Sequence, residues 1–185
     1  MRVAVNVSGV EFWRRYFLDD VETILENTGL EAGSLELEFT EDTLIQDVPS
    51  AIVTLQALRA LGVHVAIDHF GTGHSSLSDL QQFPIDVLKV DPSVVQGIVA
   101  DEQDAPVLTA IIGLGTGLNR RVMVAGVETV GQLAFLHAHH CSEAQGHLFS
   151  PPIGADALTE LLGHWRGRIR DGQAVTMAAP GTTRG

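Results

Sequence analysis

The chain has 185 residues, and 45% of them are hydrophobic, which is enough for one domain with a buried core. Its 11 basic and 23 acidic residues give a formal net charge of -12, which excludes a DNA- or RNA-binding protein that works by bulk electrostatic attraction. The only cysteine, Cys141, cannot form an internal disulfide and predicts a cytoplasmic location, and the absence of an apolar run of roughly 18 residues excludes direct membrane insertion.

The first elements are a strand, a helix and a second strand. Residues 2–7 have the pattern of a strand, and Ser8 and Glu11 have the spacing of a capping box that opens a helix. Gly29 ends this helix, and residues 35–39 form the next short strand. The apolar positions of the helix are Phe12, Tyr16, Val21, Ile24 and Leu25.

The same alternation continues through the middle of the chain. Pro49 begins a helix that Gly62 closes, and a β-branched strand follows at residues 63–67. After a glycine-rich loop, a short helix is predicted at residues 77–80 and a strand at residues 87–90.

The last third repeats the pattern and ends in a tail. The expected elements are a helix at 104–118, a strand at 122–127, a helix at 130–137, a strand at 145–149 and a helix at 155–165. We expect residues 1–166 to form the domain. Residues 167–185 are rich in Gly, Arg, Thr and Ala without a period, which predicts a disordered tail.

This order of strands and helices predicts an α/β fold of βα units, whose natural closed form is a TIM-type (β/α)8 barrel. Such a barrel has eight strands and typically about 250 residues, so we expect about six of the eight βα units here. The other two would precede Arg2. A six-stranded arc exposes two sheet edges, which predicts a homodimer or an upstream regulatory segment as cover.

Polar side chains stand at or near the ends of the predicted strands. They are Asn6, Glu38, Glu41, Asp68, Lys89, Asp91, Glu128 and Gln145. Because the carboxyl ends of parallel strands meet at one rim, we expect these side chains to lie together. Oxygen ligands indicate a hard cation such as Mg2+ or Mn2+, and two such ions could clamp a phosphodiester and activate a water. Lys89, the only lysine of the chain, could hold that water or balance charge in the transition state.

Six strings in this order resemble those of EAL domains, which are bacterial cyclic di-GMP phosphodiesterases built on a modified TIM barrel. The strings are Val5-Asn6-Val7-Ser8, Glu38-Phe39-Thr40-Glu41, Asp68-His69-Phe70-Gly71-Thr72-Gly73, Leu88-Lys89-Val90-Asp91, Gly126-Val127-Glu128-Thr129 and Gln145-Gly146-His147-Leu148-Phe149-Ser150. The resemblance runs from about Arg2 to about Leu162. It implies a module that hydrolyses cyclic di-GMP to linear pGpG with two divalent ions.

The resemblance also implies roles for single residues. The metal ligands would be Asn6, Glu38, Asp68 and Glu128, the last of which also counts as catalytic. Lys89 would hold the attacking water. Supporting or substrate-binding roles would fall to Asp91, Gln145 and Glu41, of which Glu41 would order the glycine-rich loop.

Several departures from the family pattern predict impaired activity. The Glu-Ala-Leu motif has no counterpart and would lie upstream of Met1. His69 replaces the second Asp of a pair that helps to bind the second metal; histidine is a further candidate ligand but suits Mg2+ poorly. Ala125 replaces an acidic residue, and His74 and His147 replace aromatic ones. Three helical glycines, Gly113, Gly115 and Gly117, each cost about 1 kcal/mol in helix stability relative to alanine. They indicate a relaxed or decaying copy of the family domain.

Other interpretations stay open at this point. The losses also suit a non-catalytic module that binds cyclic di-GMP or a partner protein. Lys89 and Asp91 could be an ordinary ion pair, or Lys89 could form a Schiff base. Glu38 could lie on a half-exposed strand. A weaker alternative is a zinc site made by His137, His139, His140 and Cys141.

Overall fold

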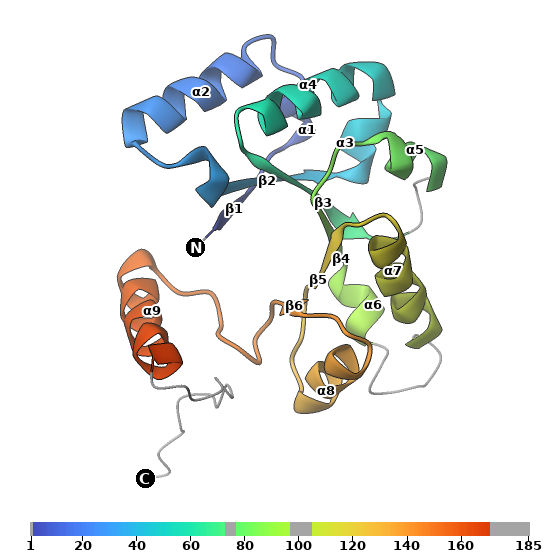
Figure 1. The fold of residues 1–185 in the computed structure, drawn as a ribbon, viewed down its shortest axis with the longest axis vertical. Helices are drawn as coiled ribbons and strands as arrows, with labels where there is room; N and C mark the ends of the chain where they lie inside the picture. Colours follow the sequence, from blue (N-terminus) through green and yellow to red (C-terminus); the bar gives the residue numbers. More distant parts are fainter. Residues whose placement is uncertain (1, 73–76, 97–104, 171–185) are drawn as a thin grey trace.

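The structure is a computed structural model that describes residues 2–72, 77–96 and 105–170. Within these residues, six parallel strands form one curled sheet in the order β1-β2-β3-β4-β5-β6, with helices along its outer side (Figure 1). The strands are β1 (Val3–Asn6), β2 (Leu35–Thr40), β3 (His64–Phe70), β4 (Val87–Val90), β5 (Arg121–Val124) and β6 (Glu143–Ala144). Each strand pairs with the next one in the chain, so the predicted series of βα units is confirmed.

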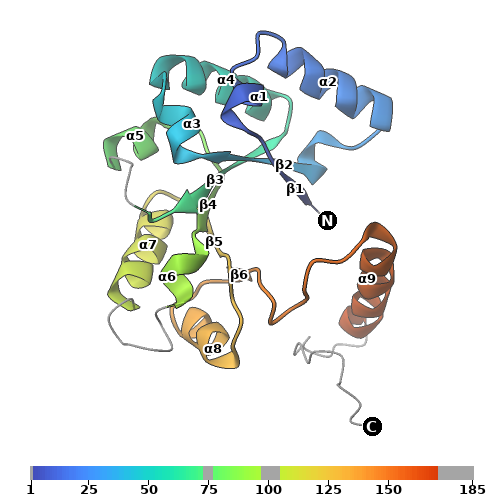
Figure 2. The same cartoon turned by 180° about the vertical axis from the view of Figure 1, so that it is seen from behind.

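The helices alternate with the strands. They are α1 (Gly9–Phe12), α2 (Phe17–Thr28), α3 (Glu41–Ile45), α4 (Val48–Ala60), α5 (Leu77–Gln82), α6 (Pro92–Gln96), α7 (Ala105–Gly117), α8 (Val130–Ala138) and α9 (Ala155–Arg170), with a 3-10 turn η1 (Ala32–Ser34). The short helices α3 and α6, which follow β2 and β4, were not predicted. Helix α9 stands apart from the sheet in both views (Figures 1 and 2). None of the helices in the described ranges could cross a membrane.

The outer face of the sheet carries the apolar cores. Side chains alternate between the two faces of a strand, and the outward Phe39, Ile67 and Leu88 are at most 1% exposed in a core that includes residues of α2 and α4. A second core joins Val124 of β5 to α7 and α8. Phe70, the last residue of β3, packs against both cores. The inner face carries buried charged side chains beside small apolar ones such as Ala66 and Val87.

The helix predicted after the first strand is in fact two helices, α1 and α2, separated by residues 13–16. The capping box at the start of α1 is confirmed, because Ser8 Oγ accepts from the N–H of Glu11 and the Glu11 carboxylate accepts from the N–H of Ser8. The break changes the phase of the second helix. Tyr16 lies in the break and Ile24 lies on α2, and they are 57% and 58% exposed, so the prediction of both on an apolar face is wrong.

The strand predicted at residues 145–149 is also wrong, because β6 precedes Gln145 and the chain turns after it. A Cβ on Gly146 would lie 2.1 Å from the carbonyl oxygen of Val127, so this close approach requires glycine. The N–H of Leu148 donates to the same carbonyl at 3.1 Å. Gln145 nevertheless keeps its position at the carboxyl end of a strand.

Gly115 lies where α7 presses against β5. A Cβ at this position would be 2.2 Å from Cγ2 of Val122, whereas Gly113 and Gly117 face open space. The helix can approach the strand this closely only because residue 115 has no side chain. The interpretation of all three glycines as a sign of relaxation is therefore wrong for Gly115.

Helix α9 runs to Arg170, so it is longer than the predicted 155–165 and contains the boundary predicted after residue 166. Residues 171–185, which make up the rest of the predicted tail, lie outside the described residues. His74 also lies outside them.

Candidate functional site

Asn6, Glu38, Asp68 and Lys89 come together on the inner face of the sheet, from the neighbouring strands β1 to β4. Asn6 is the register partner of Glu38, and Asp68 is the register partner of Thr40, two residues further along β2. Because inward side chains recur at every second residue, Glu38 and Asp68 point to the same side.

The side chains of Asn6, Glu38 and Asp68 converge at their tips. One terminal atom of the Asn6 amide lies 3.2 Å from Glu38 Oε2 and 3.2 Å from Asp68 Oδ2. With nitrogen at this position the amide donates to both carboxylates, whereas with oxygen there three oxygens face one another and require a cation. Glu38 Oε1 is buried and has no hydrogen-bond partner among the described residues. This donor set fits a hard divalent cation.

Lys89 supplies the positive charge of the cluster. Its Nζ lies 2.5 Å from Glu38 Oε2 and 3.9 Å from Asp68 Oδ1, and the side chains of Lys89 and Glu38 are 8% and 2% exposed. One ammonium group against two carboxylates leaves a negative charge that attracts a further cation. The contacts of Lys89 with Glu38 and Asp68 contradict the simple Lys89–Asp91 ion pair.

Asp91 instead binds His69. His69 Nδ1 lies 2.6 Å from Asp91 Oδ2, and its Nε2 lies 3.6 Å from Asp68 Oδ2. The hydrogen bond with Asp91 raises the pKa of the imidazole. Burial acts to raise the pKa of Asp91, but hydrogen bonds from Ser93 and His69 hold that pKa below its ordinary value. The pair is therefore held by a charge-assisted hydrogen bond.

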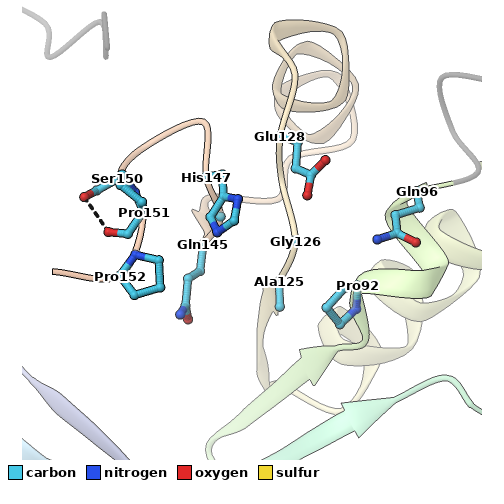
Figure 3. Close-up of a pocket in the computed structure, with 11 residues that line it drawn as sticks. Pro92, Gln96, Ala125, Gly126, Glu128, Gln145, His147, Ser150, Pro151 and Pro152 are labelled. Carbon is cyan, nitrogen blue, oxygen red and sulfur yellow. Dashed lines mark hydrogen bonds between the residues drawn. The ribbon is translucent and has the colours of Figure 1, made fainter. Parts of the chain in front are cut away.

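Glu128 and Gln145 line a pocket of about 490 Å³ near the ends of β5 and β6, together with Pro92, Gly126 and His147. Both are exposed, and their side chains point in different directions (Figure 3). Strand β5 ends before the predicted residue 127, and Gly126 has a positive φ of 78°. In the described part of the chain, no three His, Cys, Asp or Glu side chains gather into a metal-binding group, so Glu128 does not complete the cluster on the inner face.

Gln132, which was not predicted as a functional residue, fixes the segment that carries Glu128. Its Oε1 accepts from the N–H groups of Glu128 at 2.8 Å and Thr129 at 3.0 Å, and its Nε2 donates to the carbonyl of Val95 at 3.1 Å. The Thr129 to Gln132 spacing of a capping box was the signal that could have identified it.

Glu41 begins α3 and is 6% exposed. With Thr40, Asp68, His69 and Thr72 it lines a cavity of about 210 Å³. Thr72 belongs to the start of the glycine-rich loop, and its hydroxyl donates to the carbonyl of His69 at 3.2 Å. The position of Glu41 thus brings it to the base of that loop.

The histidine-rich segment near Cys141 makes local contacts. His139 Nδ1 lies 2.9 Å from the carbonyl oxygen of Phe135, and Cys141 Sγ lies 3.5 Å from the carbonyl of Val122. Burial raises the pKa of the Cys141 thiol, which disfavours the thiolate that zinc binds. The zinc alternative gains no support from this geometry.

Comparison with known proteins places these observations in a family. The family model described as "EAL domain" matches residues 1–152. Cyclic di-GMP phosphodiesterase NbdA of Pseudomonas aeruginosa is 45% identical over 166 residues, which are 90% of this chain and 21% of that protein. The bifunctional diguanylate cyclase/cyclic di-GMP phosphodiesterase MucR of the same organism is 38% identical over 84% of this chain and 23% of its own length. The chain thus spans about a fifth of these relatives.

Solved structures agree with the sequence match. The EAL domain of Mycobacterium smegmatis DcpA superposes with a TM-score of 0.85 at 38% identity, covering 89% of this chain and 74% of that one. The PaMucR phosphodiesterase in complex with c-di-GMP superposes with a TM-score of 0.81 at 38% identity, covering 85% of this chain and 64% of that one. From its sequence match and its curled parallel sheet, the chain belongs to the EAL domain family.

Proposed function

We propose that this chain is a cytoplasmic module for the metal-dependent hydrolysis of cyclic di-GMP to linear pGpG, with Mg2+ or Mn2+ as the ions. The observation that carries the proposal is the convergence of Asn6, Glu38 and Asp68 beside the buried Lys89. The phosphodiesterase relatives support the substrate, and the single cysteine supports the compartment.

In this proposal Asn6, Glu38 and Asp68 hold one divalent cation through their oxygens. A bound divalent cation lowers the pKa of its water and offsets the charge of the phosphodiester. The Lys89 ammonium, which lies between the two carboxylates, would then donate to the attacking water and orient it. Glu128 and Gln145, which line the neighbouring pocket, would hold a phosphate-bound ion and the nucleotide.

We expect the activity to be low. Glu128 lies outside the inner-face cluster, and His69 replaces an acidic residue of the family pattern. Each change reduces the negative charge available to a second Mg2+ ion. This geometry also favours the second candidate, a module that binds cyclic di-GMP without turnover.

The test uses the purified 185-residue chain with cyclic di-GMP and Mn2+, with pGpG followed by chromatography and binding followed by calorimetry. Glu38→Gln should abolish pGpG formation. Glu36→Gln is the matched control, since Glu36 lies on the same face of β2 and is equally buried but pairs with Arg2 and Arg121. Binding without pGpG would select the non-catalytic candidate, and no binding at all would refute both.

The exposed edge of β1 is the observation behind the proposed partner. All four residues of β1 are exposed, including Val3 and Val5 at 46% and 44%. An exposed apolar edge strand pairs readily with another chain. We therefore propose that a second copy or an upstream segment of the same protein covers it.

A further inference from the structure

The register between β3 and β4 contains a bulge at the rim. Ile67 pairs with Leu88, but the next pair is Phe70 with Val90, so β3 advances three residues where β4 advances two. One residue is therefore extra on β3. His69 has a φ of 57°, in the left-handed region that non-glycine residues rarely adopt.

The bulge determines the direction in which the side chain of His69 points. In a regular strand His69 would point outward, opposite to Asp68, and Phe70 would point inward. With one extra residue, Phe70 returns to the outer face and packs into both cores. His69 stays at the rim with its side chain 57% exposed, in contact with Asp68 and Asp91. The side chains of two consecutive residues, Asp68 and His69, therefore lie at the same rim.

The imidazole is held in one orientation. Asp91 Oδ2 engages Nδ1 at 2.6 Å, while Asp91 Oδ1 accepts from the backbone N–H of Ser93 at 2.8 Å. A carboxylate on one ring nitrogen of a histidine fixes the tautomer and leaves the other nitrogen as a ligand. That other nitrogen, Nε2, lies 3.6 Å from Asp68 Oδ2.

This separation suits two ligands of one ion. Metal–oxygen and metal–nitrogen distances are about 2.0–2.2 Å, so two ligand atoms on one ion lie at most about 4.4 Å apart. The His69 Nε2 to Asp68 Oδ2 distance of 3.6 Å is within that limit. Both residues also line the cavity of about 210 Å³ next to Glu41, which gives an ion access from solvent.

We propose that Asp68 Oδ2 and His69 Nε2 form a mixed oxygen–nitrogen position for a second divalent ion, with Asp91 as its positioning residue. This inference rests on the proposed function, because the ion would be the second metal of that site. An imidazole ligand favours first-row transition ions such as Mn2+ or Zn2+ over Mg2+. The histidine therefore changes the metal preference of the site and does not abolish metal binding.

The test measures the ligand directly, in the absence of cyclic di-GMP. Mn2+ is added to the full chain, and electron-spin-echo envelope modulation detects nitrogen bound to the ion. We expect imidazole nitrogen modulation in the unchanged protein and its loss in His69→Asn. Asparagine tolerates the left-handed backbone of residue 69, so the variant should keep the fold. His140→Asn is the matched control, because His140 also has a positive φ of 59° and is exposed.

Metal competition gives a second readout. His69→Asp should lower the Mg2+ concentration that displaces Mn2+ by about tenfold or more, and Asp91→Asn should weaken Mn2+ binding about tenfold while the nitrogen signal remains. Absence of nitrogen modulation in the unchanged chain, or its persistence in His69→Asn, would overturn the inference. Failure of the proposed function alone would leave these spectra intact and remove only pGpG formation.

Discussion

At the scale of single residues, the inner face of the sheet carries a buried cluster of charged side chains. Glu38 and Lys89 are almost fully buried and share one short contact, with Asp68 beside them. Removing one partner of a buried ion pair is costly, since the other charge stays buried without compensation. Lys89 therefore has a structural role as well as its proposed role toward water.

Lys89→Met should lower the free energy of unfolding by about 3–5 kcal/mol without metal, because Glu38 and Asp68 then repel each other uncompensated. Urea unfolding with and without Mn2+ is the measurement, and Mn2+ should recover more stability in the variant than in the unchanged protein. Arg59→Met is the control, since Arg59 pairs with Asp86 with 43% of its side chain exposed and should cost no more than about 1 kcal/mol. Equal losses in the two variants would contradict a buried ion pair at Lys89.

The thiol of Cys141 should make stability depend on alkaline pH. Burial raises its pKa above the ordinary value of about 8.5. The unfolded chain loses this proton first, so the stabilising contribution is complete below the unfolded pKa and is lost as the pH rises through the folded pKa. Unfolding free energies between about pH 7.5 and 10 should fall more steeply for the unchanged chain than for Cys141→Ala. Parallel curves would show that the thiol is not shielded.

At the scale of elements, sequence patterns identified β1 to β5 because each contains a short apolar run, whereas the strand predicted at residues 145–149 was wrong. Glu38, Asp68 and Lys89 could be anticipated at the rim because each lies near the end of such a run. The break between α1 and α2 could not, since the apolar spacing continues through residues 13–16. Nor could the bulge at His69 be predicted, because it depends on how β3 aligns with β4. The position of Glu128 depends on Gly126 and Gly146, whose tight contacts are tertiary.

The contact between α7 and β5 gives a paired prediction. Gly115→Ala should lower the unfolding midpoint, because its Cβ would lie 2.2 Å from Val122 Cγ2 and the helix must move away. Gly113→Ala should raise the midpoint, with a gain of up to about 1 kcal/mol in the free energy of unfolding, because that position is open and alanine is the better helix former. Thermal unfolding followed by circular dichroism measures both. A stabilising Gly115→Ala would mean that α7 does not pack this closely.

At the scale of the whole molecule, charged contacts cross the inside of the curled sheet. Arg121 of β5 reaches Glu36 of β2 at 3.0 Å and Glu143 of β6 at 2.9 Å, and Arg2 adds a contact with Glu36 at 3.5 Å. These contacts lie at the amino ends of the strands, away from the rim. The Arg121–Glu36 contact joins β5 to β2, which are not neighbours in the sheet, whereas the other two contacts join neighbouring parts of it.

The exposed edge of β1 predicts association. Light scattering should give a mass above that of one chain at micromolar concentration, and Val5→Lys should shift it toward the monomer, because a charged edge strand resists pairing. Val53→Lys is the control, since Val53 is 65% exposed on α4, away from the edge. A monomer at all concentrations would indicate that the edge is tolerated without a partner.

The position of Phe70 affects how the two apolar cores unfold. It packs against both apolar cores, and it directly follows His69 in the bulge. Two cores that share few side chains can open as separate cooperative units, each with its own hydrogen-exchange rate. An ion bound by Asp68 and His69 would strengthen the connection that Phe70 makes between these two units. Amide protons of both units would then exchange more slowly when the ion is bound. Hydrogen exchange in helices far from the rim would therefore report whether the ion is present.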